Sequence, residues 1–177
     1  MLPQLVCILG GECSGKTTLA NALAQELSSL WVPEYLREFC QTQGRAPHSD
    51  EQGLIMRTQF DREELALSQA RQNGMRYVFC DTSPLLTAVY STHYFSDESL
   101  LGSAHAVQGR YALSLVLKPD VTWQPDGRMR DGEAARTAIH IRLLHELQSG
   151  CFPYIEVGGK GELRLATALL AVGTLSC

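Results

Sequence analysis

The feature that most constrains this chain is the run GGECSGKT at residues 10–17. It fills the pattern GxxxxGK[ST] with Gly10, Gly15, Lys16 and Thr17, and it follows an apolar stretch and precedes an amphipathic one. Glycines let such a turn form a nest of backbone N–H groups that holds phosphate oxygens. The Lys adds a positive charge, and the Thr hydroxyl is suited to bind Mg²⁺. The motif therefore predicts a nucleoside triphosphate site, with ATP and Mg²⁺ as expected ligands.

The whole loop and the first residues after it are expected to contact the triphosphate. The alternative is a glycine-rich turn that only joins a strand to a helix, and the combination of motif and context disfavours it. The helix that follows the loop adds a favourable dipole for anions. The predicted nucleotide-binding residues are Gly10, Gly11, Glu12, Cys13, Ser14, Gly15, Lys16, Thr17 and Thr18.

Apolar runs alternate with amphipathic stretches along the chain. Short apolar runs predict strands buried on both faces, at 5–9, 29–32, 77–80, 112–117 and 154–157. Apolar spacing of three to four residues predicts helices from Thr17 onward, over about 50–72, around 135–147 and near 161–170. Ser49 and Gln52 resemble a capping box before the second of these helices. The alternation predicts an α/β fold, a three-layer P-loop NTPase with a five-stranded parallel sheet flanked by helices.

The overall composition favours a single intracellular domain over residues 1–177. A hydrophobic content of 45% can supply a sizeable core, and the formal charge of −4 argues against a nucleic-acid partner. No apolar stretch reaches the roughly 20 residues of a membrane span. The six cysteines contain no CxxC pair, so we expect free thiols in a reducing cytoplasm. The start of the chain is interpreted as a first strand rather than a cleaved signal.

Polar residues follow two of the predicted strands at the edge where ligands bind in open parallel sheets. Asp81 ends the third strand, where we expect it to complete the Mg²⁺ site with Thr17. It could instead cap the helix that begins near Ser83 and Pro84, or hydrogen-bond an acceptor hydroxyl.

The block that follows the second strand is the predicted acceptor side. Glu34 is a candidate proton acceptor, because transfer to a hydroxyl requires a group that takes its proton. Tyr35 could flank a base or sugar, and Arg37 could hold phosphate or substrate oxygens. The alternative for all three is a solvated helix start.

Residues 123–132, WQPDGRMRDG, form a predicted lid after the fourth strand. Arg128 and Arg130 would stabilise the charge that spreads over the equatorial oxygens during phosphoryl transfer. Trp123 would stack on a substrate ring or pack within the lid. The alternative is a plain surface loop.

Taken together, these blocks resemble the ribosylnicotinamide kinase domain of NadR-like proteins, over nearly the whole chain. The matching segments are GGECSGKTTLA, WVPEYLREFC, VFCDTSPLLT, KPDVTWQPDGRMRD and PYIEV. The resemblance implies a cytoplasmic kinase that phosphorylates the 5′-hydroxyl of nicotinamide riboside (NR) with ATP to give nicotinamide mononucleotide, a step toward NAD. It also implies that Glu34, Tyr35 and Arg37 are substrate-side residues, that Asp81 is a catalytic or magnesium carboxylate, and that Asp126, Arg128 and Arg130 belong to the lid.

Some features depart from that family, and other functions stay open. Cys13 stands where such loops often carry Ser, and NadR-like proteins commonly have further domains before the kinase, so adenylyl-transfer and regulatory activities are not expected here. One alternative is a thymidylate or deoxynucleoside kinase, which differs only in its acceptor pocket. The other is a nucleotide-dependent switch or ATPase, but residues 117–120, LKPD, do not supply the NKxD motif of a GTPase.

Overall fold

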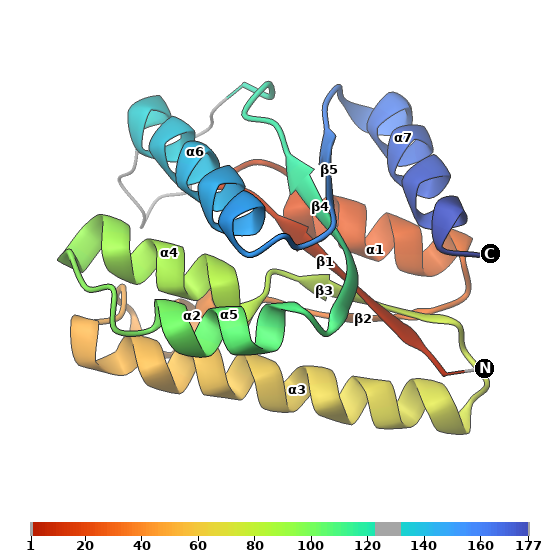
Figure 1. Ribbon diagram of the computed structural model, residues 1–177, viewed down its shortest axis with the longest axis horizontal. Helices are drawn as coiled ribbons and strands as arrows, with labels where there is room; N and C mark the ends of the chain where they lie inside the picture. Colours follow the sequence, from red (N-terminus) through yellow and green to blue (C-terminus); the bar gives the residue numbers. More distant parts are fainter. Residues whose placement is uncertain (1, 123–131, 177) are drawn as a thin grey trace.

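A parallel sheet forms the centre of the computed structural model, which describes residues 2–122 and 132–176 (Figure 1). Its order is β2-β3-β1-β4-β5, and each neighbouring pair of strands is parallel. The strands are β1 (Gln4–Leu9), β2 (Leu30–Val32), β3 (Tyr77–Asp81), β4 (Tyr111–Leu117) and β5 (Tyr154–Val157). The prediction of a five-stranded parallel sheet is confirmed, and each strand starts and ends within about a residue of the predicted apolar run.

Helices connect these strands and cover both faces of the sheet (Figure 1). They are α1 (Lys16–Glu26), α2 (Tyr35–Gln43), α3 (Gln52–Gln72), α4 (Pro84–Phe95), α5 (Leu101–Gln108), α6 (Glu133–Ser149) and α7 (Gly161–Gly173), with short 3-10 turns η1 (Ser49–Glu51) and η2 (Thr174–Ser176). Apolar spacing does not reveal α4 and α5, because eight consecutive residues of α4 are buried and α5 is only 8 residues long.

The start of α3 differs from the predicted capping box. The carboxylate of Glu51, rather than the side chain of Gln52, accepts the bond from a backbone N–H, that of His48, at 2.7 Å. Glu51 also forms an ion pair with Arg45, at 2.7 Å between Nη1 and Oε2. The prediction of a Ser49–Gln52 box is therefore wrong by one residue, because a charged carboxylate that is also paired is the stronger acceptor.

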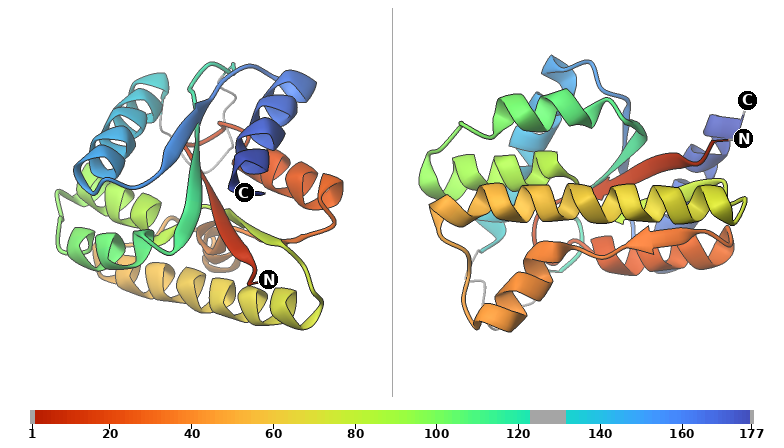
Figure 2. Two further views of the ribbon diagram at one scale, coloured as in Figure 1. Left: turned by 45° about the vertical axis from the view of Figure 1, so that its right-hand side comes forward. Right: turned by 90° about the horizontal axis from the view of Figure 1, so that it is seen from below.

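The two faces of the sheet are covered by different helices (Figure 2). Alternate residues of β1 divide between two cores, as the two-residue period of a strand requires. Leu5, Cys7 and Leu9 pack with buried residues of α2 to α6, whereas Val6 and Ile8 pack with those of α1 and α7. Burial on both faces explains why these strands are continuous apolar runs.

Strand order decides where the site lies. The chain leaves β1 for α1 on one face of the sheet, and the later strands lie on both sides of β1, with β3 on one side and β4 on the other. In open α/β sheets, such a reversal of the strand order leaves a crevice beyond the carboxyl ends of the strands. The phosphate loop follows β1 directly, so it lies at this crevice.

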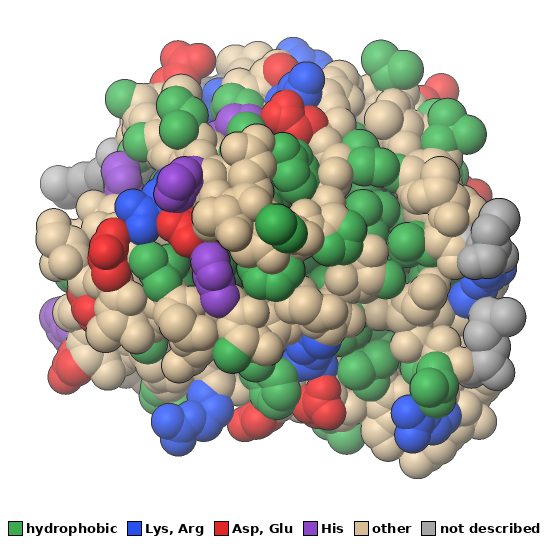
Figure 3. Space-filling model, in the orientation of Figure 1, with side chains coloured by type: hydrophobic (Ala, Val, Ile, Leu, Met, Phe, Trp, Pro, Cys, Tyr) green, Lys and Arg blue, Asp and Glu red, His purple; other side chains and the backbone are tan. Residues whose placement is uncertain are grey.

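The face shown in Figure 3 carries charges of both signs, with Lys and Arg side chains scattered among Asp and Glu. One cluster joins α5 and α6: Glu146 contacts His105 at 2.8 Å and Arg142 at 2.6 Å, and Arg142 also contacts Glu98 at 2.9 Å. Over the described ranges, no helix has both the length and the apolar character needed to cross a membrane.

Candidate active site

The phosphate loop is folded into the shape that the motif predicts. Gly10 has a φ of 154° and Gly15, which precedes α1, has a φ of 87°. The hydroxyl of Ser14 donates to the Gly11 carbonyl at 2.8 Å, and the Lys16 ammonium donates to the same carbonyl at 3.2 Å. No side chain caps the start of α1, and its first turn carries no acidic residue. N–H groups at a helix start without such a cap can bind a phosphate.

Thr17, at the end of this loop, contacts Asp81 at the end of β3. The Thr17 hydroxyl donates to Asp81 Oδ2 at 2.5 Å, while the other carboxylate oxygen of Asp81 is buried with no hydrogen-bond partner in the described part of the chain. A carboxylate oxygen left over beside a hydroxyl fits a Mg²⁺ ion that takes most ligands from phosphate and water. The described residues contain no group of three or more His, Cys, Asp or Glu that could hold a metal.

Glu34 ends the connection from β2 to α2 and lies near this pair. Burial raises the pKa of its carboxyl, and so does the charge of Asp81, whereas Lys16 and Arg37 lower that pKa. The residue as a whole is partly buried. The fold therefore brings Glu34, Asp81 and Lys16, which are far apart in sequence, within electrostatic reach of one another.

The other two residues of the predicted acceptor block differ in exposure. Tyr35 is partly buried, with the Arg62 guanidinium 4.6 Å from its ring centroid and the Phe39 ring 6.4 Å away. Arg37 is exposed. Their roles toward a substrate stay predictions. Four predicted lid residues, Trp123, Asp126, Arg128 and Arg130, lie outside the described residues.

Two arginines outside the predicted site lie against the phosphate loop, one on α7 and one on α6. Arg164 on α7 is buried and donates to the Ser14 carbonyl and to Asp120, three residues after β4, whose other oxygen accepts from the Gly159 N–H at 2.7 Å. Nothing in the sequence marks this residue, because an arginine on an amphipathic helix is ordinarily solvated.

The second arginine, Arg136 on α6, binds the segment that follows β4. It is 2% exposed and donates to the carbonyls of Val121, at 2.9 Å, and Pro119, at 3.2 Å. Its backbone also packs so closely on the loop that a Cβ at Gly11 would lie 3.2 Å from the Arg136 Cα. Gly11 is therefore needed for this approach, although it occupies a variable position of the motif.

Three further residues in and after the loop differ in their exposure to solvent. Glu12 and Cys13 are partly buried, and Thr18 is exposed. Among the described residues the cysteines form no disulfides, and Cys177 lies outside that range.

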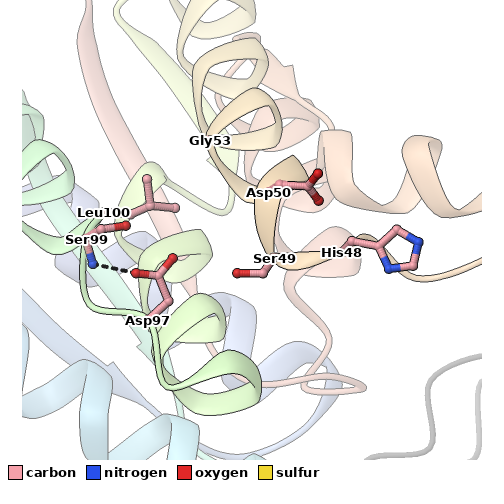
Figure 4. Close-up of a pocket in the computed structure, with 7 residues that line it drawn as sticks. All are labelled: His48, Ser49, Asp50, Gly53, Asp97, Ser99 and Leu100. Carbon is pink, nitrogen blue, oxygen red and sulfur yellow. Dashed lines mark hydrogen bonds between the residues drawn. The ribbon is translucent and has the colours of Figure 1, made fainter.

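A hollow of about 550 Å³ lies apart from the predicted residues (Figure 4). It is found between the start of α3 and the connection from α4 to α5, where Asp97 accepts a bond from the Ser99 N–H at 2.9 Å. Its lining is formed by His48, Ser49, Asp50, Gly53, Asp97, Ser99 and Leu100. None of the predicted site residues that the structure describes lines this hollow.

A family model described as an AAA domain matches residues 5–164, from β1 into α7. The chain belongs to this AAA domain family. Among curated proteins it is similar to the trifunctional NAD biosynthesis/regulator protein NadR of Salmonella typhimurium, at 27% identity over 162 residues. That match covers 87% of this chain and 38% of NadR. The chain thus spans well under half the length of this relative.

Two of the similar solved structures are also of NadR proteins. A NadR protein in complex with NR has a TM-score of 0.84 at 23% identity and covers 98% of this chain and 51% of that chain. NadR in complex with NAD and AMP-PNP gives 0.81 at 24% identity, covering 98% and 49%. Thymidylate kinase from Ehrlichia chaffeensis gives 0.66 at 14% identity, covering 96% and 98%. The P-loop kinase fold and the resemblance to the kinase domain of NadR-like proteins are confirmed.

Proposed function

We propose that this chain is an ATP-dependent phosphotransferase that phosphorylates the 5′-hydroxyl of nicotinamide riboside, a step of NAD salvage in the cytoplasm. The observation that carries the proposal is the Glu34 carboxyl, which lies within electrostatic reach of Lys16 and Asp81. A carboxylate beside a phosphate loop is what transfer to a hydroxyl needs, because the acceptor must lose a proton as it attacks.

The donor side is assigned to the phosphate loop. Its backbone N–H groups and Lys16 would hold the phosphates of ATP, and Thr17 and Asp81 would hold Mg²⁺. When bound, Mg²⁺ neutralises charge that develops between the β- and γ-phosphates. Arg164 would act through the loop by holding the Ser14 carbonyl, and Arg136 would act through its close packing on Gly11.

The acceptor side is assigned to Glu34. As the acceptor oxygen bonds to the γ-phosphorus and the bond to the ADP oxygen breaks, the hydroxyl proton passes to the Glu34 carboxylate. A pKa raised by burial makes that carboxylate a stronger base than an exposed Glu. Tyr35, Arg37, Trp123 and Asp126 are proposed to bind the nucleoside.

The lid is proposed to supply positive charge during transfer. Arg128 and Arg130 would approach the equatorial oxygens of the γ-phosphoryl group when the acceptor is bound. Lys16 would act from the loop side, so charge would be stabilised from two directions.

Nicotinamide riboside is proposed as the acceptor because of the relatives. NadR of Salmonella typhimurium is described as an NAD biosynthesis protein, and a similar NadR protein was crystallised with NR. A second candidate is phosphorylation of a pyrimidine nucleotide or deoxynucleoside, supported by the likeness to thymidylate kinase and to deoxyadenosine kinase from M. mycoides, the latter with a TM-score of 0.61 at 9% identity.

A single panel assay tests the activity. The chain is incubated with ATP, Mg²⁺ and, separately, nicotinamide riboside, thymidine, thymidylate and deoxyadenosine, while ADP release and the phosphorylated product are followed. We expect acceptor-dependent ADP release that is fastest with nicotinamide riboside. Equal ADP release without any acceptor would favour an ATPase, and preference for thymidylate would favour the second candidate.

The proton acceptor is tested separately. Glu34→Gln should lower turnover by roughly 100-fold or more while ATP affinity stays within about twofold, since only the transfer step needs the base. Asp81→Asn is the matched comparison, because it should act mainly through Mg²⁺. Unchanged turnover in Glu34→Gln would assign proton transfer to Asp81 instead.

A further inference from the structure

Two buried polar side chains of α3 lie beneath the start of α2. Gln59 is 1% exposed and Glu63, one helical turn later, is 0% exposed. Gln59 Oε1 accepts a bond from the backbone N–H of Tyr35 at 2.9 Å, and Gln59 Nε2 donates to Glu63 Oε1 at 3.3 Å. A buried amide with both ends engaged is held in one orientation.

The contact with Tyr35 gives a partner to the first N–H of α2, which has none within the helix. The first N–H groups of a helix have no partner within it, and the side chain of the preceding residue often accepts from one of them. That residue is Glu34, with extended backbone (φ −65°, ψ 116°), and its side chain makes no capping bond to α2. A capping side chain at Glu34 would accept from the second or third N–H of α2, whereas Gln59 accepts from the first, that of Tyr35.

Glu63 determines which way the Gln59 amide faces. The Tyr111 hydroxyl donates to Glu63 Oε2, so the remaining oxygen, Oε1, accepts from Gln59 Nε2. The nitrogen of the amide therefore faces Glu63, and its oxygen faces Tyr35. A side chain without this donor and acceptor pair could not bridge the two groups.

We propose that Gln59, oriented by Glu63, is a positioning residue for the transfer reaction: it anchors the backbone N–H of Tyr35 and so fixes the backbone of Glu34, the residue before it. This inference rests on the proposed role of Glu34 as proton acceptor. Without this anchor, the start of α2 would shift, and the Glu34 carboxylate beside it would lose its fixed position relative to Lys16 and Asp81.

The first test is Gln59→Leu, which keeps the approximate volume and removes both hydrogen bonds. Turnover with the acceptor should fall between roughly 10- and 100-fold, because a small displacement of a catalytic group has effects of that size. The dissociation constant of a fluorescent ATP analogue should change less than about twofold. In the Glu34→Gln background the same substitution should cause no further loss of turnover, because no base is left to position.

The second test reverses the hydrogen bond without removing it. Gln59→Glu alone places two carboxylates together and should lower turnover. In the double variant Gln59→Glu/Glu63→Gln, the new Gln donates to the new Glu, which still accepts from the Tyr35 N–H, while Tyr111 still donates to position 63. Turnover should return to within about threefold of wild type. Far-UV circular dichroism confirms that each variant is folded.

Three outcomes overturn the proposal. Wild-type turnover in folded Gln59→Leu, an equal loss in the Glu34→Gln background, or no recovery in the folded double variant would each do so. If Glu34→Gln itself retains full turnover, the role of Glu34 fails and the positioning role fails with it. If Glu34→Gln loses turnover but Gln59→Leu does not, only the positioning role is refuted.

Discussion

The ionisation of Glu63 is expected to make the stability of this fold depend on pH. Its carboxyl is fully buried between α3 and β4, where it contacts Gln59, Tyr111 and the thiol of Cys80, and Arg110 lies 3.8 Å away. Burial raises the pKa of Glu63 to about 7, and Tyr111 and Arg110 offset part of that rise. In the unfolded chain the ordinary value of 4.5 applies.

The sign and size follow from this difference. Between the two pKa values the folded state holds a proton that the unfolded state has lost, so the free energy of unfolding decreases as pH rises. The stabilisation is fully present below about pH 4.5 and is lost above about pH 7. A difference of about 2.5 pH units, at about 1.36 kcal/mol each, corresponds to about 3 kcal/mol.

Urea unfolding of the wild type and of Glu63→Gln, followed by circular dichroism from about pH 4 to about pH 8.5, measures this term. The Gln side chain does not ionise, so the stability of the wild type minus that of the variant should fall by about 3 kcal/mol across the range. Glu64→Gln is the control, since Glu64 is 54% exposed and pairs with the same Arg110. Parallel pH profiles for wild type and Glu63→Gln would refute the reasoning.

Four further substitutions test the site. Lys16→Ala should lower turnover at least roughly 100-fold with an unchanged circular dichroism spectrum, since a single charge contact to the phosphates is lost. Asp81→Asn should raise the Mg²⁺ concentration for half-maximal activity by roughly tenfold, measured by metal titration. Arg164→Met should reduce stability by about 2 kcal/mol in urea unfolding and weaken binding of an ATP analogue, because the Ser14 carbonyl loses its donor. Gly10→Ala should lower stability by about 1–3 kcal/mol in thermal denaturation, because its φ of 154° suits glycine and the new Cβ would lie 2.8 Å from the Ser14 hydroxyl oxygen.

Much of the candidate site is predictable because its residues lie where local patterns end. The phosphate loop is a contiguous motif, and Asp81 and Glu34 each follow an apolar run that forms a strand. In a parallel sheet such strand ends gather at one edge, so a one-dimensional pattern indicates a three-dimensional cluster. The strands themselves are equally readable, because burial on both faces makes them continuous apolar runs.

The supporting residues are not predictable in this way. Arg136, Arg164, Gln59 and Glu63 lie on helices, at positions where polar side chains are ordinarily solvated. Their burial arises only when α3, α6 and α7 pack on the sheet and the phosphate loop, and no local pattern records which polar residue meets which backbone carbonyl. The α4 and α5 helices are hidden for a related reason, since burial on most sides of α4 removes its periodicity.

The sequence by itself therefore determines that a triphosphate-binding loop joins a buried strand to a helix, and that carboxylates follow the neighbouring strands. Such features depend on the spacing of residues that lie close together in the sequence, so they can be read from a short segment of the chain. The tertiary structure alone decides that β1 lies between β3 and β4, that Glu34 comes within reach of Lys16, and that Gln59 of α3 accepts from the first N–H of α2. Those facts depend on contacts between distant segments, whose geometry is set by how the helices pack on the sheet.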